Sequence, residues 1–210
     1  MSIGGTIRRL FGPYERQISE RYRAIYVDVD AYAASLRAWV PNPRRILEVG
    51  CGEGAVSERL AALYPNSEIT AIDITPNVGR LYAGPLGRVR FAETTIEAFA
   101  AREQGKFDLI VLADVMHHVP PGSARQSILE TVKFLLAGDG HLAFKEWERT
   151  PTPIHWLGYF SDRWITGDRI SYMDGDEIRT QLRNVFGAGS IRAEARVRPW
   201  RNNVSLLVRP

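Results

Sequence analysis

The spacing of apolar residues predicts one long helix near the start of the chain. From Tyr14 to Val40, apolar side chains recur every three or four positions, as on the buried face of an amphipathic helix. Pro41 and Pro43 follow directly, and proline ends a helix because it lacks the amide hydrogen and disfavours helical backbone before it. We therefore expect a single helix over residues 14–40.

Short apolar runs and helical patterns alternate over the rest of the chain. The runs expected to form strands are residues 45–49, 68–72, 88–91, 107–113, 141–145, 190–197 and 203–208. The patterns expected to form helices are residues 55–64, 123–136 and 174–187. This alternation predicts an α/β fold with a Rossmann-like, doubly wound sheet of seven strands, mostly parallel. Because the last two strands have no helix between them, we expect an antiparallel C-terminal hairpin.

Local signals refine these boundaries. Two pairs fit the capping box that begins a helix, namely Ser123 with Gln126 and Asp174 with Glu177. Residues 138–140 (Gly-Asp-Gly) predict a turn before the strand at residue 141. Residues 147–173 fit neither the helical nor the strand period, so we interpret them as an insertion.

Length and composition exclude several classes of protein. A chain of 210 residues with 45% hydrophobic and 24% charged residues is typical of one globular domain. No apolar run approaches the ~20 residues that span a bilayer, and residues 1–17 lack the pattern of a secretory signal. The one cysteine excludes a disulfide framework and a Cys-rich zinc site. We expect a cytoplasmic protein without a metal site.

The charge pattern does not indicate a nucleic-acid partner. The net charge is only +3, and the arginines near the C-terminus alternate with apolar residues, as on a solvated strand face. Residues 3–11 form a short amphipathic segment, for which packing on the protein is favoured over contact with a membrane. A homodimer is left open.

Four polar or glycine-rich sites follow the predicted parallel strands. They are the glycine loop at residues 50–54, Asp73, the turn at residues 114–118, and Glu146. In a doubly wound sheet, ligands bind beyond the carboxyl ends of the strands. We therefore expect these four sites to meet at one ligand-binding edge.

The glycine loop differs from a dinucleotide-binding loop. Its spacing is G-x-G-x-G with Glu48 two residues before the first glycine, whereas a dinucleotide site prefers G-x-G-x-x-G. A carboxylate there would repel a pyrophosphate but suit a cationic ligand. Asp73, at the end of the second strand, is placed to accept both hydroxyls of a ribose. This pattern disfavours a nicotinamide-dependent oxidoreductase.

The stretches ILEVGCGEG, AIDIT and ADVMHH together resemble the class I S-adenosylmethionine-dependent methyltransferases, in the broad group that acts on small molecules and lipids. The resemblance covers roughly residues 44–147 and implies S-adenosylmethionine as cofactor, with S-adenosylhomocysteine as product. The cofactor-binding residues that it implies are Glu48, Gly50, Cys51, Gly52, Asp73, Ile74, Thr95, Ile96 and Asp114.

The resemblance also implies a role for each part of this set. Glu48 and the backbone of residues 50–52 would hold the methionine part, Asp73 the ribose, and Ile74 the adenine ring. Thr95 stands where the family usually has an acid that binds the adenine amine, so a hydroxyl or the backbone would make that contact here. Cys51 is expected to be unreactive, because nothing in the sequence indicates a lowered thiol pKa.

The two histidines are candidate general bases. A methyl acceptor with a hydroxyl or ammonium group must lose a proton, and histidine titrates in the right range. His118 is the first candidate and His117 the second, with Tyr22 or Tyr26 as a possible partner by resemblance to the phosphobase methyltransferases. The alternative is that the histidine pair is only a structural turn.

Aromatic residues of the insertion are candidates for the acceptor pocket. The residues expected to contact the acceptor are Tyr26, Glu146, Trp147, Trp156, Tyr159, Phe160 and Trp164. The alternative is that these rings form a small core of the insertion. We divide the chain into a helical cap (1–43), a cofactor-binding core (44–146), an aromatic lid (147–173) and a C-terminal helix and hairpin (174–210).

The sequence thus favours methyl transfer from S-adenosylmethionine to a small organic acceptor. The acceptor would be an aromatic, amine or lipid-like molecule methylated on oxygen or nitrogen. The turn at residues 114–117 lacks the N/D-P-P-Y/F pattern of enzymes that methylate nucleic-acid amines. The alternative from another class is a catalytically silent protein that binds the cofactor for regulation or as a scaffold.

Overall fold

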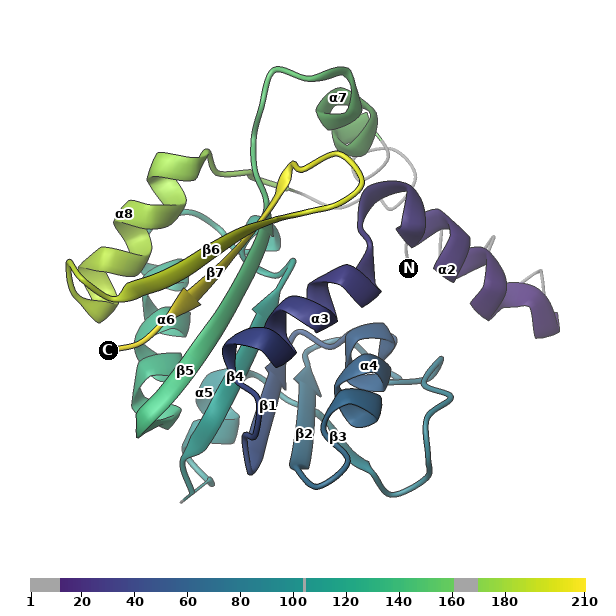
Figure 1. Ribbon diagram of the computed structural model, residues 1–210, viewed down its shortest axis with the longest axis horizontal. Helices are drawn as coiled ribbons and strands as arrows, with labels where there is room; N and C mark the ends of the chain where they lie inside the picture. Colours follow the sequence, from purple (N-terminus) through teal and green to yellow (C-terminus); the bar gives the residue numbers. More distant parts are fainter. Residues whose placement is uncertain (1–11, 104, 161–169) are drawn as a thin grey trace.

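The computed structural model describes residues 12–103, 105–160 and 170–210. Its centre is a sheet in the order β3-β2-β1-β4-β5-β7-β6 (Figure 1). The strands are β1 (Arg45–Val49), β2 (Glu68–Asp73), β3 (Val89–Glu93), β4 (Phe107–Ala113), β5 (Leu136–Trp147), β6 (Ile191–Val197) and β7 (Asn203–Val208). Strands β1 to β5 are parallel, and β7 pairs antiparallel with both β5 and β6. The predicted fold class is confirmed, including the C-terminal hairpin.

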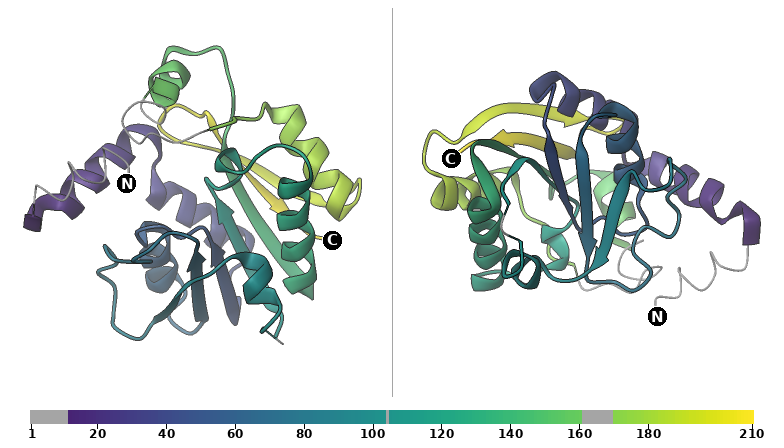
Figure 2. Two further views of the ribbon diagram at one scale, coloured as in Figure 1. Left: turned by 180° about the vertical axis from the view of Figure 1, so that it is seen from behind. Right: turned by 90° about the horizontal axis from the view of Figure 1, so that it is seen from below.

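Helices cover both faces of this sheet (Figures 1 and 2). One face carries α3 (Val29–Trp39) and α4 (Ala55–Leu63), and the other carries α5 (Ile96–Ala100), α6 (Ser123–Leu135) and α8 (Gly175–Phe186). Two more helices, α2 (Glu15–Tyr26) and α7 (Pro153–Phe160), lie toward the carboxyl ends of the parallel strands. Short 3-10 turns η1 (Gly12–Tyr14) and η2 (Met116–His118) complete the elements of the described residues, in which no helix is long and apolar enough to cross a bilayer.

Alternate residues of the central strands pack into two different cores. In β1, Leu47 and Val49 join the core with α5, α6 and α8, whereas Ile46 joins the core beneath α3 and α4. In β4, Ile110 and Leu112 join the core with α5, α6 and α8, whereas Leu109 and Val111 join the core beneath α3 and α4. Because both faces are covered by helices, these strands are apolar at nearly every position, and this explains the clear strand signal over residues 107–113.

The single helix predicted over residues 14–40 is wrong, because the structure has two helices there. Val27 is extended, with φ −148° and ψ 131°, and interrupts the helical hydrogen bonding. The carboxylate of Asp28 then accepts a hydrogen bond from the amide of Ala31 at 2.8 Å and caps α3. Aspartate is a strong helix N-cap, so a new helix begins although the apolar spacing continues.

Ion pairs hold α2 against the rest of the described chain. Neither hydrophobic core contains a residue of α2 among the parts of the chain that the structure describes. The pairs are Glu15 with Arg80 (2.6 Å), Arg16 with Glu58 (2.6 Å) and Glu20 with Arg59 (2.9 Å). After the break at Val27, α2 is a separate helix, and these ion pairs position it over α4 and the loop after β2.

Two other local predictions are wrong, namely the turn at residues 138–140 and the capping box of Ser123 with Gln126. Strand β5 begins at Leu136 and continues through residues 138–140, where a shift in its register against β4 accommodates the glycines. Ser123 begins α6 but makes no capping hydrogen bond, because Gly122 occupies the N-cap position.

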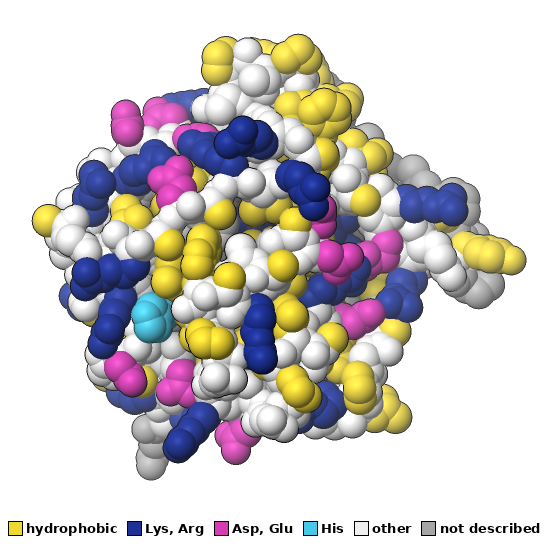
Figure 3. Space-filling model, in the orientation of Figure 1, with side chains coloured by type: hydrophobic (Ala, Val, Ile, Leu, Met, Phe, Trp, Pro, Cys, Tyr) yellow, Lys and Arg dark blue, Asp and Glu magenta, His cyan; other side chains and the backbone are white. Residues whose placement is uncertain are grey.

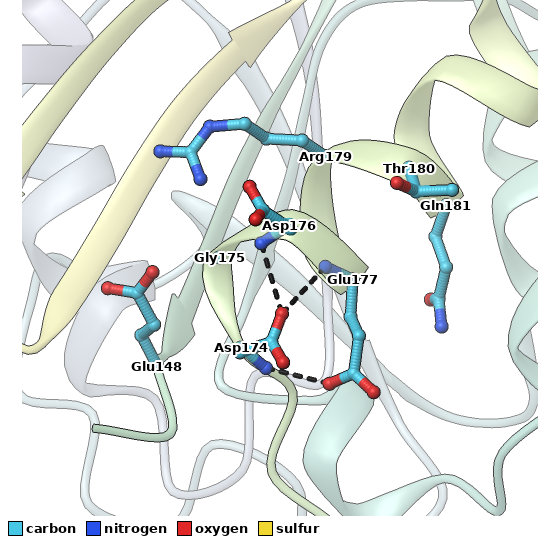
Figure 4. Close-up of a pocket in the computed structure, with 8 residues that line it drawn as sticks. All are labelled: Glu148, Asp174, Gly175, Asp176, Glu177, Arg179, Thr180 and Gln181. Carbon is cyan, nitrogen blue, oxygen red and sulfur yellow. Dashed lines mark hydrogen bonds between the residues drawn. The ribbon is translucent and has the colours of Figure 1, made fainter. Parts of the chain in front are cut away.

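The capping box of α8 is confirmed. The Asp174 carboxylate accepts hydrogen bonds from the amides of Asp176 and Glu177, and Glu177 accepts one from the amide of Asp174 at 2.8 Å (Figure 4). These residues line an open depression together with Glu148, which forms an ion pair with Arg196. The carboxylates of Glu148, Asp174 and Glu177 are thus engaged in capping and ion pairing.

The aromatic insertion contains a helix that the sequence pattern does not reveal. Helix α7 has only eight residues, too few for a helical period to stand out. Its His155 and Gly158 are buried, whereas Trp156, Leu157 and Phe160 are exposed. Figure 3 shows hydrophobic side chains gathered at this end of the molecule.

Candidate active site

The glycine loop between β1 and α4 is closely packed around its first glycine. The amides of Gly50 and Cys51 donate to the carbonyl of Ile72 at 2.8 and 3.1 Å, which fixes the loop against the end of β2. Gly50 has φ +77°, and a Cβ there would overlap the side chain of Val115. Gly52 has φ +50°, but the space where its Cβ would lie is open. The loop therefore packs tightly on one side and leaves backbone accessible on the other.

Alanine at Gly50 is expected to destabilise the fold more than alanine at Gly52. Left-handed backbone costs a non-glycine residue roughly 1–2 kcal/mol, and forcing a methyl into a packed site adds about 1–3 kcal/mol. Gly50→Ala should therefore lower the free energy of unfolding by about 2–5 kcal/mol, and Gly52→Ala by about 1–2 kcal/mol. Urea denaturation measures both, and equal losses would contradict the close packing at Gly50.

Asp73 ties the end of β2 to this loop. Its Oδ2 accepts a hydrogen bond from the amide of Gly52 at 2.7 Å, and its Oδ1 accepts from the amide and hydroxyl of Thr75 at 2.8 and 2.7 Å. A carboxylate has about four lone-pair positions, so it retains capacity for further donors. Ile74 follows directly and is 72% exposed. An acceptor-rich carboxylate and an exposed apolar side chain thus lie side by side at the open edge of the loop.

Glu48 lies beneath the loop with a perturbed protonation state. It is 3% exposed and accepts a hydrogen bond from the Ser57 hydroxyl at 2.5 Å. Burial, with a smaller contribution from the nearby carboxylate of Asp73, raises the pKa of Glu48 to about 7, although the hydrogen bond from Ser57 acts in the opposite direction. A cationic group bound near it would favour the ionised form. Burial also raises the pKa of the Cys51 thiol, which is consistent with an unreactive cysteine.

Thr95 and Ile96 have structural partners in the described chain. The Thr95 hydroxyl accepts a hydrogen bond from the amide of Ala98 at 3.2 Å and so caps α5. Ile96 is 5% exposed and packs in the core with α6 and α8. Whether either contacts the adenine ring stays a prediction.

A buried lysine fixes the residue that follows β4. Lys145 is 1% exposed, and its Nζ lies 2.6 and 2.5 Å from the two carboxylate oxygens of Asp114. Asp114 has φ +57°, and its amide donates to the carbonyl of Lys145 at 2.9 Å. The sequence analysis missed Lys145, although a lysine inside the apolar end of a central strand is itself a signal of a buried partner.

Glu146, the next residue of β5, holds His117. Its Oε1 accepts a hydrogen bond from the amide of Met116 at 2.6 Å, and its Oε2 lies 2.7 Å from Nδ1 of His117. Glu146 is 1% exposed and His117 6% exposed. A neutral His117 that donates its Nδ1 hydrogen to the carboxylate carries its lone pair on Nε2. The pair is thus an oriented carboxylate–histidine dyad.

The two histidines have different surroundings. His117 is buried and lines a cavity, whereas His118 is exposed and stacks on it with ring centroids 4.1 Å apart. His118 is not among the described residues that line this cavity. The structure therefore brings the second sequence candidate, rather than the first, to the site.

The cavity beside His117 has a volume of about 220 Å³. Its lining residues are Ser19, Tyr22, Arg23, Tyr26, Val27, Asp114, His117, Trp147, Gly158, Tyr172 and Asn203. Tyr26 packs edge-on against both Tyr22 and Trp147, with ring centroids 5.4 and 5.9 Å apart. The cavity is therefore a slot between α2, the ends of β4 and β5, and α7, with four aromatic side chains in its lining.

The cavity brings together three of the aromatic residues predicted for the site. Tyr22, Tyr26 and Trp147 line it, whereas Gly158 is the one residue of α7 in the described lining. Trp156, Tyr159 and Phe160 lie on the exposed side, with exposed fractions of 57%, 36% and 56%, and do not line the described cavity. Trp164 and residues 3–11 lie outside the described residues.

His155 supports the inner wall of this slot. Its Nδ1 accepts a hydrogen bond from Nε1 of Trp147 at 3.0 Å. Burial, together with the positive charge of Arg149, lowers the pKa of His155, so its ring remains a neutral acceptor at neutral pH. Trp147 is thereby fixed in its position against Tyr26.

Comparisons with known proteins identify the family of the chain. The sequence model of the methyltransferase domain family matches residues 14–185. The chain is 35% identical over 115 residues to a ubiquinone biosynthesis O-methyltransferase of Xanthomonas axonopodis pv. citri, covering 53% of this chain and 46% of that protein. The chain thus spans about half the length of the curated relatives it matches.

Solved structures share the fold at low sequence identity. An O-methyltransferase family protein from Burkholderia thailandensis has a TM-score of 0.71 and 17% identity, over 96% of this chain and 59% of that one. A 1,6-didemethyltoxoflavin-N1-methyltransferase from the same species, solved with its namesake compound and S-adenosylhomocysteine, has a TM-score of 0.65 and 18% identity, over 98% and 87%. The chain belongs to the methyltransferase domain family and has the fold of the class I S-adenosylmethionine-dependent methyltransferases.

Proposed function

We propose that the protein transfers a methyl group from S-adenosylmethionine to a hydroxyl group of a small aromatic acceptor. The observation that carries the proposal is the Glu146–His117 dyad, at 2.7 Å, whose histidine lines a cavity together with Asp114 and four aromatic side chains. A phenolic hydroxyl must lose its proton during methylation, and a histidine held by a carboxylate is a suitable base. The 35% identity to an O-methyltransferase over half the chain supports oxygen rather than nitrogen as the methylated atom.

The residues around the glycine loop fit the cofactor. The open side of Gly52 admits a ligand against the backbone, and Asp73 offers its remaining lone pairs to ribose hydroxyls. Ile74 is exposed where an adenine ring would cover it. Glu48 would favour the positively charged end of the cofactor. When bound, S-adenosylmethionine supplies an electrophilic methyl group on a cationic sulfur.

The protein's own contribution to the reaction is orientation and proton removal. Glu146 keeps the Nδ1 hydrogen of His117, so Nε2 takes the proton from the acceptor hydroxyl. Lys145 neutralises Asp114 and fixes the turn that leads to the histidine. The aromatic walls hold a flat acceptor and exclude water, which raises the fraction of productive alignments.

The cavity volume limits the size of the acceptor. About 220 Å³ is below the ~300–1,000 Å³ of pockets that enclose drug-sized ligands. An acceptor with one or two rings fits this space.

Turnover with a panel of phenols tests the proposal. The purified protein is mixed with methyl-labelled S-adenosylmethionine and mono-, di- and polyhydroxylated one- and two-ring aromatics, and methyl ethers are identified by mass spectrometry. We expect a labelled aryl methyl ether together with S-adenosylhomocysteine. Tight cofactor binding without any methylated product would contradict the proposal and favour a catalytically silent binding protein.

The affinity for S-adenosylmethionine is expected to depend on pH through Glu48. Because its pKa is raised to about 7, Glu48 is mostly ionised at pH 8 and mostly protonated at pH 6. If binding of the cation needs the carboxylate, affinity falls about tenfold between pH 8 and pH 6. Calorimetry at these pH values measures the change, and Glu48→Gln should remove the slope. An unchanged slope in Glu48→Gln would show that another group is responsible.

A further inference from the structure

One wall of the acceptor cavity is a single face of α2. Ser19, Tyr22, Arg23 and Tyr26 follow the i, i+3, i+4, i+7 spacing of one helix face, and all four line the cavity. The two tyrosines belong to the aromatic slot, but Ser19 and Arg23 are polar. Both polar side chains line the same cavity as His117.

Ser19 carries a buried hydroxyl that has no hydrogen-bond partner among the residues that the structure describes. It is 2% exposed, and within the described part of the chain its Oγ makes no hydrogen bond. An unsatisfied buried hydroxyl costs free energy, and native structures rarely keep one without a reason. Because Ser19 lines the cavity, a polar group of a bound acceptor would satisfy it.

Arg23 lies one helical turn further along the same face. In the described structure its guanidinium donates one side-chain hydrogen bond, from Nη1 to Glu20 at 3.1 Å, which leaves most of its five N–H donors for a ligand. Glu20 also pairs with Arg59, at 2.9 Å, so Arg23 shares its counter-ion. A second anion next to Arg23 would therefore be stabilised.

The other charges of the cavity do not oppose an anion. Asp114 is neutralised by Lys145, and Glu146 is bound to His117 and the amide of Met116. Ser19 and Arg23 both offer hydrogen-bond donors, four residues apart on one helix face. A group that only accepts hydrogen bonds and carries a negative charge, namely a carboxylate, matches this pair best.

We propose that the acceptor is a hydroxyaryl carboxylate, whose carboxylate binds Ser19 and Arg23 while its hydroxyl faces His117. This assignment rests on the proposed function and adds the anionic class of the acceptor to it. Tyr22, Tyr26 and Trp147 contact the ring between the two polar ends. Ser19 and Arg23 are thus specificity-determining residues on α2.

Equilibrium binding tests this assignment independently of turnover. The probes are 3-hydroxybenzoate, 4-hydroxycinnamate and 3-hydroxy-2-naphthoate, each compared with its methyl ester, titrated into the protein saturated with S-adenosylhomocysteine. We expect at least one acid to bind ten times or more as tightly as its ester. Arg23→Gln should abolish this preference while leaving the affinity for the ester within twofold, and Ser19→Ala should reduce it about threefold to tenfold.

A matched variant controls for the loss of a charge on α2. Arg21 is exposed on the same helix and does not line the described cavity, so Arg21→Gln should keep the preference for the acid. The assignment is overturned if no acid binds more tightly than its ester, or if the preference survives Arg23→Gln. Binding preference for the acid without any methyl transfer would contradict the proposed function and leave the anion site standing. Methyl transfer to phenols without any binding preference for the acid would support the proposed function and overturn the anion site.

Discussion

Replacing His117 by alanine is expected to lower kcat at least 100-fold and to leave the affinity for S-adenosylhomocysteine within twofold. A positioned general base contributes about 10²- to 10⁴-fold to rate, and His117 is the histidine that lines the cavity and is held by Glu146 at 2.7 Å. The measurement is steady-state turnover of a phenol, combined with calorimetry of the product cofactor.

Two variants make this result interpretable. His117→Ala leaves the buried carboxylate of Glu146 without its histidine, which can destabilise the fold. His117→Gln keeps a hydrogen-bond donor toward Glu146 but provides no base, so it should lose the same activity with a smaller drop in Tm. His118→Ala should retain kcat within threefold, because His118 is exposed outside the described cavity lining. A large loss of kcat in His118→Ala, together with full activity in the His117 variants, would show that His118 and not His117 is the general base.

Replacing Asp73 by alanine is expected to weaken S-adenosylmethionine binding about 100-fold or more. Hydrogen bonds to a charged group contribute about 1.5–3 kcal/mol each, and two ribose hydroxyls would be lost together. The variant also removes the acceptor of the Gly52 amide, at 2.7 Å, which holds the loop in its open-sided form. Calorimetric titration of the cofactor measures the dissociation constant.

Thr75→Ala is the control for this loss. It removes the hydroxyl that donates to Asp73 at 2.7 Å but keeps the carboxylate, so affinity should change less than fivefold. Asp73→Ala with a dissociation constant within threefold of the original would contradict the ribose assignment.

The parts of the fold that the sequence predicts well are those in which local pattern and burial agree. Strand β4 is apolar at nearly every position because helices cover both its faces. The capping box of Asp174 and Glu177 can be predicted because its hydrogen-bond donors and acceptors all lie within four consecutive residues. The glycine loop is predictable for the same reason, because positive φ angles at Gly50 and Gly52 require that residue type.

The parts that the sequence does not predict depend on contacts between distant segments. The break at Val27 occurs where the apolar spacing of the helix continues without interruption. Asp28 caps α3, but nothing in the sequence distinguishes it from the other aspartates of the chain. Helix α7 is too short to show a period. The choice between His117 and His118 depends on Glu146, which lies 29 positions along the chain from His117 and reaches it only through the pairing of β4 and β5.

A crystal structure of the protein with S-adenosylhomocysteine and a bound phenol tests the central claim most directly. The account predicts density for the cofactor along residues 50–52, with its ribose on Asp73, its sulfur facing the aromatic cavity, and the phenol oxygen between that sulfur and Nε2 of His117. A cofactor bound elsewhere, or a phenol whose hydroxyl lies away from His117, would contradict it.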